Sequence, residues 1–445
     1  MPTVSNATQA RRRARSTRAA ARELVSRLRD RLDSAIADPS LGLPALLLVA
    51  FVLRAAWIDQ PPGGLIFDEA YYVNASRTIL GLPVPDGAHY AASTPGLDPN
   101  IEHPPLGKLL IAGSMALFGD GAVGWRLPSL IAGLIVIAAV YQIVRAAGET
   151  TRLAFAIAGF VAFDNLVLVH SRIATLDILV LAPVLAGAWL ALRARWLLAG
   201  VLLGLAFLVK LSAVYGLAAV GVLLALTAIS GWRRDRRRPS EAVRAGVSLV
   251  VGFGVVGLVG LWLLDIGFTG FSSPIDHLRH MFSYGADLKA PLDQTGACTA
   301  VSAPWQWLVN ECEINYLRVN SLVREGETVV ARVSEIEFRG AMNPLLIAPL
   351  LIALLVTASL AWRTGHRLAT WSVVWALANW MPYVLLVLIS DRVTYLFYFL
   401  PVIPAAAVFL AVLLWRSGLP RWVGGVYAAA YVVAFVAYFP FRQVP

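Results

Sequence analysis

Long apolar stretches are the feature of this sequence that most constrains its fold. The predominantly apolar runs at residues 241–264 and 370–390 reach the roughly 20 residues that a helix needs to cross the hydrocarbon core of a bilayer. Charged residues make up only 14% of the chain, whereas about a quarter of the residues in a typical soluble domain are charged. The sequence therefore predicts an all-α polytopic membrane protein.

Apolar runs separated by polar turns predict about 11 transmembrane helices. They cover approximately residues 41–57, 126–145, 153–169, 174–192, 196–211, 213–230, 242–264, 342–361, 370–390, 394–415 and 422–439. Arginines concentrate at residues 1–40 and in alternate turns, among them the block at 233–238. Because an excess of Lys and Arg marks cytoplasmic loops, we expect a multi-pass protein of the cell membrane with a cytoplasmic N terminus and a C terminus outside.

This topology predicts an organisation in four regions. They are a basic cytoplasmic arm (1–40), a transmembrane module (41–264) that includes a catalytic first outer loop (58–125), a second outer loop (265–340), and C-terminal transmembrane helices (341–445). Residues 104–118 in the first outer loop are apolar but too short to cross a bilayer, so we expect a helix along the membrane interface.

The net charge of +10 does not indicate a nucleic-acid partner. The basic residues form short clusters between apolar runs, which is typical of solvated loops beside anionic lipid headgroups. We therefore expect membrane lipids, and no nucleic acid, among the partners.

Two adjacent carboxylates, Asp68 and Glu69, are the strongest candidates for chemistry. An acidic pair in a polar loop is commonly only solvated. This pair, however, lies between apolar residues near a membrane boundary, where idle charges are costly, and His103 and Lys108 follow in the same loop. A carboxylate partly shielded from water can act as a general base toward a hydroxyl group.

Several cations are expected on the same face of the membrane as the acidic pair. They are Arg126, Arg172, Lys210 and Arg392, accompanied by Asp177. Each is individually consistent with an internal ion pair or a side chain reaching for the interface. Together they suggest an anionic substrate such as a lipid-linked phosphate, which the planar fork of arginine binds with two parallel hydrogen bonds.

The second outer loop carries aromatic and sulfur side chains with two interpretations each. Trp305 and Trp307 favour an interfacial aromatic belt, with stacking on a sugar or an acceptor peptide as the alternative. Cys298 and Cys312 favour a disulfide if the loop is extracytoplasmic, with two free thiols as the alternative.

Neither a metal nor a nucleotide is predicted from the motifs. His277 and His280 are three residues apart but lack a third ligand at a suitable spacing, so we expect no metal site. A glycine-rich phosphate-binding motif is also missing from the sequence, which argues against ATP as the energy source.

The assembled pattern resembles the protein O-mannosyltransferase family, multispanning GT-C-type transferases that use a polyprenyl-phosphate sugar. The second outer loop lacks the large domain inserted in eukaryotic members, as in bacterial relatives. The matching segments, in family order, are Phe67-Asp68-Glu69, His103-Pro104-Pro105-Leu106-Gly107-Lys108, Arg126-Leu127-Pro128, Ser171-Arg172, Lys210, Pro304-Trp305-Gln306-Trp307, Asn343-Pro344 and Asp391-Arg392.

The resemblance implies inverting transfer of mannose from polyprenyl-phosphate-mannose to Ser or Thr of secreted proteins on the outer face. Asp68 would be the catalytic base and Glu69 its partner at the acceptor or sugar. It implies no cofactor, since the lipid-linked sugar is a substrate, and an acceptor polypeptide emerging from the secretion machinery. Donor-phosphate ligands would be Arg126, Lys210 and Arg392, and substrate-loop or supporting residues His103, Lys108, Arg172, Asp177, Trp305 and Trp307.

Two other functions use the same features. The same scaffold could glycosylate a lipid or a cell-wall glycan instead of a protein. A transporter is the alternative from another class, but transporters commonly place their charges near the midplane between inverted repeats. Here the charges crowd one face and the sequence shows no repeat.

Overall fold

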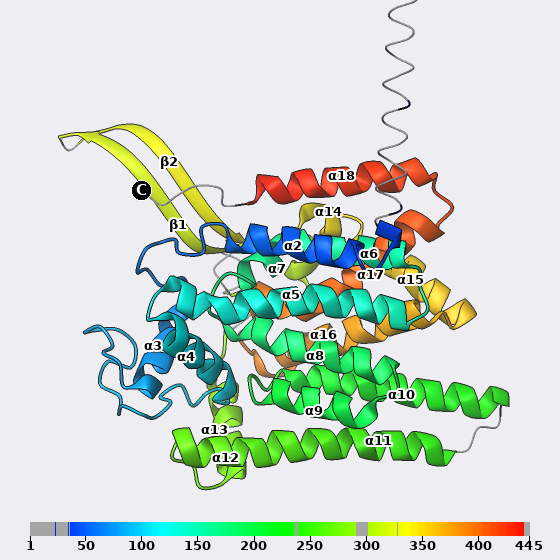
Figure 1. The fold of residues 1–445 in the computed structure, drawn as a ribbon, viewed down its shortest axis with the longest axis horizontal. Helices are drawn as coiled ribbons and strands as arrows, with labels where there is room; N and C mark the ends of the chain where they lie inside the picture. Colours follow the sequence, from blue (N-terminus) through cyan, green and yellow to red (C-terminus); the bar gives the residue numbers. More distant parts are fainter. Residues whose placement is uncertain are drawn as a thin grey trace, which may run out of the picture.

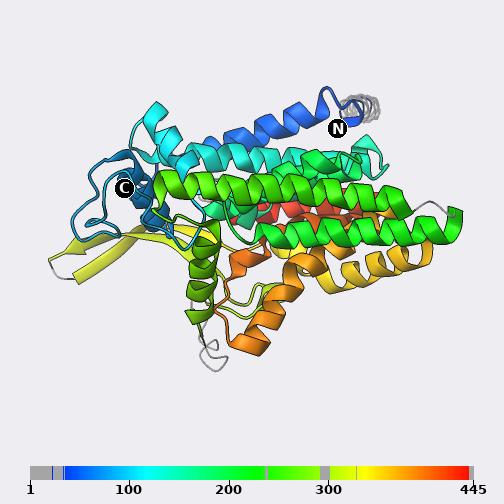
Figure 2. The ribbon, with the colours of Figure 1, turned by 90° about the horizontal axis from the view of Figure 1, so that it is seen from below.

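The computed structural model describes residues 36–439, apart from 236–238, 291–300 and 327, together with residues 23 and 34. The predicted basic arm at residues 1–40 therefore lies almost entirely outside the described residues. Most of the described chain is helical, and the long helices run side by side as one bundle (Figures 1 and 2).

Each predicted span coincides with one helix or with consecutive helical segments. These are α2 (Gly42–Ala55), α5 (Ala122–Ala146), α6 (Thr151–Ala162) with α7 (Asn165–His170), α8 (Leu176–Leu192), α9 (Trp196–Phe207), α10 (Ala213–Asp235), α11 (Pro239–Gly254) with the π-helical turn η1 (Val255–Val259) and α12 (Gly260–Phe268), α14 (Pro344–Ile347) with α15 (Leu350–Thr364), α16 (Arg367–Ser390), the 3₁₀ segment η4 (Leu396–Val402) with α17 (Ile403–Arg416), and α18 (Arg421–Ala437).

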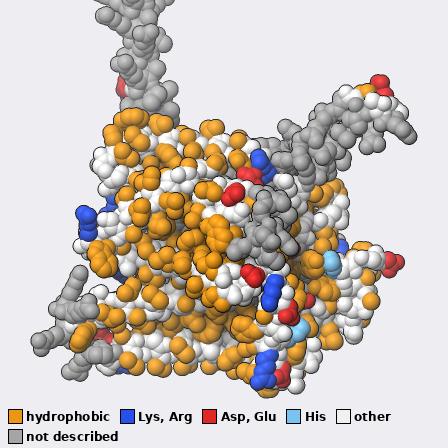
Figure 3. Space-filling view, turned by 180° about the vertical axis from the view of Figure 1, so that it is seen from behind, with side chains coloured by type: hydrophobic (Ala, Val, Ile, Leu, Met, Phe, Trp, Pro, Cys, Tyr) orange, Lys and Arg blue, Asp and Glu red, His pale blue; other side chains and the backbone are white. Residues whose placement is uncertain are grey.

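The helices have the composition that a membrane requires. In the described chain, 5 helices are long and apolar enough to cross a bilayer by length and composition, and the shorter ones are apolar as well. Hydrophobic side chains also cover most of the face shown in Figure 3, where charged groups gather mainly to one side. Such an extensive exposed apolar surface marks a membrane contact. The all-α membrane fold is thus confirmed, and the count of about 11 crossings stays a prediction.

The break between α6 and α7 shows why a predicted span is interrupted. Asp164 stands at the break, and its Oδ1 accepts a hydrogen bond from the amide of Val167 at 3.0 Å, which caps α7. Its Oδ2 accepts from the amide of Asn343 at 2.9 Å, and the Asn343 side chain donates to the carbonyl of Tyr431 at 3.0 Å. The break is therefore held by polar contacts with distant parts of the chain.

The first outer loop contains two helices, α3 (Glu69–Leu80) and α4 (Leu106–Phe118). The second of these matches the predicted interfacial helix, and it begins directly after Pro105, where the missing amide hydrogen of proline costs little. Leu110, Leu117 and Phe118 are exposed on α4, so the helix presents apolar side chains outward.

The second outer loop has more regular structure than the sequence analysis anticipated. It contains α13 (Pro274–Asp287), the short 3₁₀ helix η3 (Gln306–Val309), and an antiparallel hairpin of β1 (Ile314–Glu325) and β2 (Thr328–Gly340). The hairpin projects from one end of the bundle (Figure 1). β-branched residues recur on both sides of Gly326, whose φ is 65°, and this pattern is a hairpin signal.

The two ends of the bundle differ in what they carry. The turns after α5, α8, α15 and α17 lie at one end, and α3, α4, α13 and the hairpin lie at the other (Figure 1). At the first end Glu149 joins three turns, since it pairs with Arg416 at 2.6 Å and with His366 at 3.0 Å. The candidate site lies at the second end, among α3, α4 and the connections that follow the long helices.

Candidate active site

Asp68 occupies the turn that begins α3. The preceding Phe67 has a φ of 53°, an unusual left-handed conformation for a bulky residue, and its ring packs edge-on against Tyr316 with centroids 4.7 Å apart. The Asp68 side chain forms no hydrogen bond or ion pair with the part of the chain that the structure describes. The turn is thus held by aromatic packing, while the carboxylate has no polar partner among the described residues.

The electrostatic surroundings of Asp68 suit a general base. Burial raises the pKa of Asp68 to about 7, the negative charge of Asp177 adds to the rise, and the positive charge of Lys210 opposes it. A base with a pKa near the working pH combines a useful ionised fraction with a strong affinity for the proton.

Lys210 and Asp177 form an ion pair within electrostatic range of Asp68. The Lys210 Nζ donates to Asp177 Oδ1 at 2.7 Å, and both side chains are largely buried. The Nζ also lies over the rings of Phe397 and Tyr398, at 5.7 and 5.5 Å from their centroids. The pair joins the start of α8 to the connection between α9 and α10. Asp177 and Lys210, which are far apart in sequence, therefore meet near Asp68.

Arg392 and His103 approach the same region from other elements. Arg392 follows Asp391, which ends α16 with a φ of 51°, and its Nη1 donates to the Leu288 carbonyl at 3.3 Å. Burial holds the pKa of His103 well below its usual value, and the positive charges of Lys210, Lys108 and Arg392 lower it further. His103 is therefore a neutral imidazole among cations.

Glu69 and Arg126 form a closed buried pair, which argues against the contacts with substrate that we expected of them. The guanidinium donates to both Glu69 oxygens at 2.8 Å, and its remaining hydrogens reach the carbonyls of Ile58, Gln60 and Gly64. The Glu69 oxygens also accept from the amides of Ile66 and Ala174, at 2.7 and 2.8 Å. All five guanidinium hydrogens are used, so none is left for a phosphate.

Two more cations, predicted as substrate-loop or supporting residues, are engaged in holding loops. Lys108 pairs with Asp98 at 2.7 Å with both side chains fully buried. Arg172 donates to the carbonyls of Leu53 and Ala56 and lies over the rings of Phe338 and Phe439. Lys108 and Arg172 therefore stabilise the loops around Asp68.

The two tryptophans of the Pro304–Trp307 segment have different environments. Trp305 is 42% exposed, as an interfacial residue would be, whereas Trp307 is 0% exposed. The Trp307 indole donates to the Ser302 hydroxyl at 2.9 Å and packs against Tyr383 and Tyr398. The predicted belt position is wrong for Trp307, which is a core residue because η3 turns it inward.

The cysteine prediction is only partly covered by the structure. Cys312 is buried and disulfide-bonded, while Cys298 lies outside the described residues, so the pairing of the two stays a prediction. As for metals, the described part of the chain contains no group of three or more His, Cys, Asp or Glu side chains placed to hold an ion.

Tyrosines complete the surroundings of Asp68, and the sequence analysis did not single them out. Tyr72 lies four residues after Asp68 and is buried, with its ring 6.1 Å from that of His103. Tyr316 on β1 bonds through its hydroxyl to His170 Nε2 at 2.7 Å. The four-residue spacing on one helical face was a usable signal for Tyr72, whereas the approach of Tyr316 depends on the hairpin.

Comparison with known proteins supports the resemblance found in the motifs. Residues 102–256 match the family described as dolichyl-phosphate-mannose-protein mannosyltransferase. A polyprenol-phosphate-mannose–protein mannosyltransferase of Corynebacterium glutamicum is 34% identical over 137 residues, 27% of this chain and 26% of the relative. One of Mycobacterium tuberculosis is 37% identical over 114 residues, 23% of this chain and 22% of the relative. The chain thus matches about a quarter of these relatives' length.

Solved structures extend the likeness at the level of fold. A chain of the S. cerevisiae protein O-mannosyltransferase complex bound to its sugar donor superposes with a TM-score of 0.67 at 11% identity, covering 93% of this chain and 91% of that one. ArnT from Cupriavidus metallidurans bound to undecaprenyl phosphate gives 0.54 at 19% identity, covering 88% and 63%. The sequence of residues 102–256 is thus similar to the dolichyl-phosphate-mannose-protein mannosyltransferase family, and nearly the whole chain shares the fold of the S. cerevisiae protein O-mannosyltransferase chain.

Proposed function

We propose that this protein transfers mannose from polyprenyl-phosphate-mannose to Ser or Thr hydroxyls of secreted polypeptides, with inversion at the anomeric carbon. The observation that carries the proposal is Asp68, an unpartnered carboxylate among the described residues, whose pKa of about 7 and neighbouring cations fit a base beside an anionic donor. The names of the sequence relatives support the choice of donor and acceptor.

In the proposed reaction Asp68 accepts the proton of the acceptor hydroxyl. The hydroxyl oxygen attacks the anomeric carbon opposite the phosphate, the bond from that carbon to the phosphate oxygen breaks, and polyprenyl phosphate leaves with the electron pair. Base and cations must therefore flank the sugar. Cations fixed in place before the reaction stabilise the charge that develops on the leaving phosphate.

The available hydrogens favour some of the cations over others as ligands of the phosphate. Arg392 uses one Nη1 hydrogen on a carbonyl oxygen, so its fork retains donors for a phosphate. Lys210 shares its charge with Asp177, which makes it the weaker ligand and leaves it suited to hold the pair beside Asp68. We assign Arg392 as the principal phosphate ligand, with Lys210 second and Arg126 outside the set.

The proposed orientation places the active site and the C terminus outside and the N terminus in the cytoplasm of the cell. The arginine-rich turns gather at the end of the bundle opposite α3 and α4 (Figure 1), as the preference for positive charge inside requires. The donor's polyprenyl chain would then lie in the outer leaflet, and the acceptor would reach Asp68 as it emerges from the secretion machinery.

Replacing the base tests the proposal. Asp68→Asn keeps the size of the side chain but cannot accept the proton, so transfer should fall by roughly 10²- to 10⁴-fold, the typical contribution of general acid–base catalysis. The matched control is Asp86→Asn, which changes an exposed carboxylate in the same loop. Purified enzyme with labelled polyprenyl-phosphate-mannose should be offered a Ser/Thr peptide and, separately, a glycolipid acceptor. Full activity of Asp68→Asn would refute the base, and transfer to the glycolipid alone would refute the protein acceptor.

A further inference from the structure

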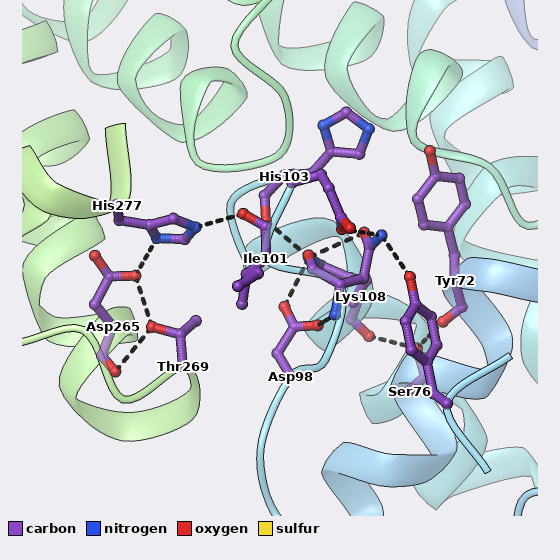
Figure 4. Close-up of polar contacts among 12 residues, drawn as sticks. Tyr72, Ser76, Asp98, Ile101, His103, Lys108, Asp265, Thr269 and His277 are labelled. Carbon is purple, nitrogen blue, oxygen red and sulfur yellow. Dashed lines mark hydrogen bonds and ion pairs between the residues drawn. The ribbon is translucent and has the colours of Figure 1, made fainter. Parts of the chain in front are cut away.

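A buried pair of ionisable side chains joins the second outer loop to the first, and the proposed reaction does not use it. Asp265 lies in the last turn of α12 and His277 in α13, with His277 Nδ1 2.6 Å from Asp265 Oδ1 and both side chains 0% exposed. His277 Nε2 lies 2.9 Å from the carbonyl oxygen of Ile101 (Figure 4). The imidazole ring stacks on Phe271, with centroids 4.5 Å apart and planes 9° apart.

Both ring nitrogens of His277 face oxygen atoms, which fixes where hydrogens must be. A carbonyl oxygen only accepts, so Nε2 carries a hydrogen and donates it to Ile101. The contact of 2.6 Å between Nδ1 and Asp265 requires a second hydrogen, on either the imidazole or the carboxyl group. The pair is therefore electrically neutral as a whole, which suits its burial beside the Asp98–Lys108 ion pair.

The segment that His277 contacts is held firmly on its other side. The Lys108 ammonium pairs with Asp98 and donates to the carbonyl oxygens of Asn100 and His103, the latter at 2.8 Å. The Asp98 amide donates to the Phe268 carbonyl at the end of α12, at 2.6 Å. Residues 98–103 thus lie between Lys108 and the α12–α13 corner, and both attachments are buried.

The ring of His103 projects out of this network. In Figure 4 it points away from Asp98 and Lys108, toward the side on which the Tyr72 phenol lies. Among the described residues His103 has a ring contact with Tyr72, and its ring nitrogens make no hydrogen bond. A neutral imidazole with free nitrogens beside Lys210 and Arg392 is suited to hydrogen-bond an anionic or hydroxylated ligand.

We propose that the Asp265–His277 pair positions the Ile101–His103 segment, so that the His103 imidazole meets the sugar phosphate of the donor. His277 is a positioning residue, because it acts through the Ile101 carbonyl and contacts no reacting atom. The assignment of the ligand rests on the proposed function, whereas the clamp on residues 98–103 does not.

Two substitutions at His277 separate the hydrogen bond to Ile101 from the rest of the side chain's role. His277→Gln places its amide nitrogen near the position of Nε2 and keeps a donor for Ile101. His277→Asn reaches only the position of Nδ1 and loses that donor, although both variants lose the stacking on Phe271. We expect His277→Asn to raise the KM for the donor about tenfold, in line with one lost buried hydrogen bond, with the KM for the acceptor unchanged and His277→Gln within about twofold of the wild type.

Hydrogen exchange without substrate tests the clamp independently of the reaction. His277→Asn should speed amide exchange in a peptide covering residues 98–106, and His277→Gln and the neighbouring control His280→Asn should not. Equal effects of the Asn and Gln variants, or exchange that changes in α13 alone, would overturn the positioning role. Faster exchange at residues 98–106 without a change in donor KM would overturn the ligand assignment to His103. If the wild type transfers no mannose, the exchange result still decides the clamp.

Discussion

At the scale of single residues, the adjacent acids Asp68 and Glu69 have opposite environments. Successive residues at the start of a helix point about 100° apart, so one carboxylate can face the site while the next faces the core. Glu69 accepts hydrogen bonds from Arg126 and two amides, and Asp68 stays open. The sequence identified the pair, but the direction of each side chain depends on Arg126 and Ala174, which are distant in the chain.

The pKa of Asp68 predicts the pH dependence of the reaction. The carboxylate must be ionised to accept a proton, so kcat/KM should rise tenfold per pH unit below about pH 7 and level off above it. Asp177→Asn should move this limb to lower pH, because it removes a negative charge that raises the pKa of Asp68 and leaves Lys210 uncompensated. The measurement is a pH–rate profile at subsaturating donor. An unchanged limb in Asp177→Asn would contradict the assignment.

Arg126 and Arg392 should respond differently to the same substitution. Arg126→Gln leaves the buried Glu69 carboxylate without its partner, a change that typically destabilises by roughly 3–5 kcal/mol, so the thermal midpoint of the solubilised protein should fall. Arg392→Gln removes a charged donor from a partly exposed site and should weaken donor binding about 10- to 100-fold, with the thermal midpoint unchanged. Thermal unfolding and the binding of labelled donor should be measured for both variants. Weaker donor binding with an unchanged thermal midpoint in Arg126→Gln would show instead that Arg126 binds the phosphate.

At the scale of elements, the apolar runs predicted where helices form, because length and hydrophobicity decide this locally. They did not predict where helices break. The gap between α6 and α7 depends on the contact of Asp164 with Asn343, a partner far away in the sequence. The hairpin of β1 and β2 was missed for another reason, since charged residues interrupt its alternating pattern and favour the interpretation as a polar loop.

The η3 turn and the residue that precedes it offer a matched pair of tryptophans. Trp307→Ala removes a fully buried indole, and such changes cost roughly 3–5 kcal/mol of stability. Trp305→Ala changes a residue that is 42% exposed, so its effect on stability should stay within about 0.5 kcal/mol. Thermal unfolding of the two variants provides the comparison. Equal losses would show that both indoles belong to the core.

At the scale of the whole molecule, the sequence predicted the fold class and the gathering of Asp68, Asp177 and Lys210 at one end. Charges that interrupt apolar runs have few stable places in a membrane protein, so their positions along the chain limit where they can meet. The sequence could not distinguish Lys210, whose charge acts on Asp68, from Lys108 and Arg172, which hold loops, since all three adjoin apolar residues. These three cations differ only in the residues that they contact in the folded chain.

The orientation of the bundle determines which acceptors can reach Asp68. Seven acidic and two basic residues occupy the first outer loop, while arginines fill the turns at the opposite end, and this asymmetry predicts that the loop lies outside. In intact cells a membrane-impermeant maleimide should label Asp86→Cys, in the loop, but not Ser240→Cys, at the start of α11, until the membrane is permeabilised. The wild type, whose Cys312 is disulfide-bonded, provides the background. The opposite labelling would place Asp68 in the cytoplasm, where a secreted polypeptide emerging from the membrane cannot reach it, and would exclude the proposed acceptor while leaving the base chemistry intact.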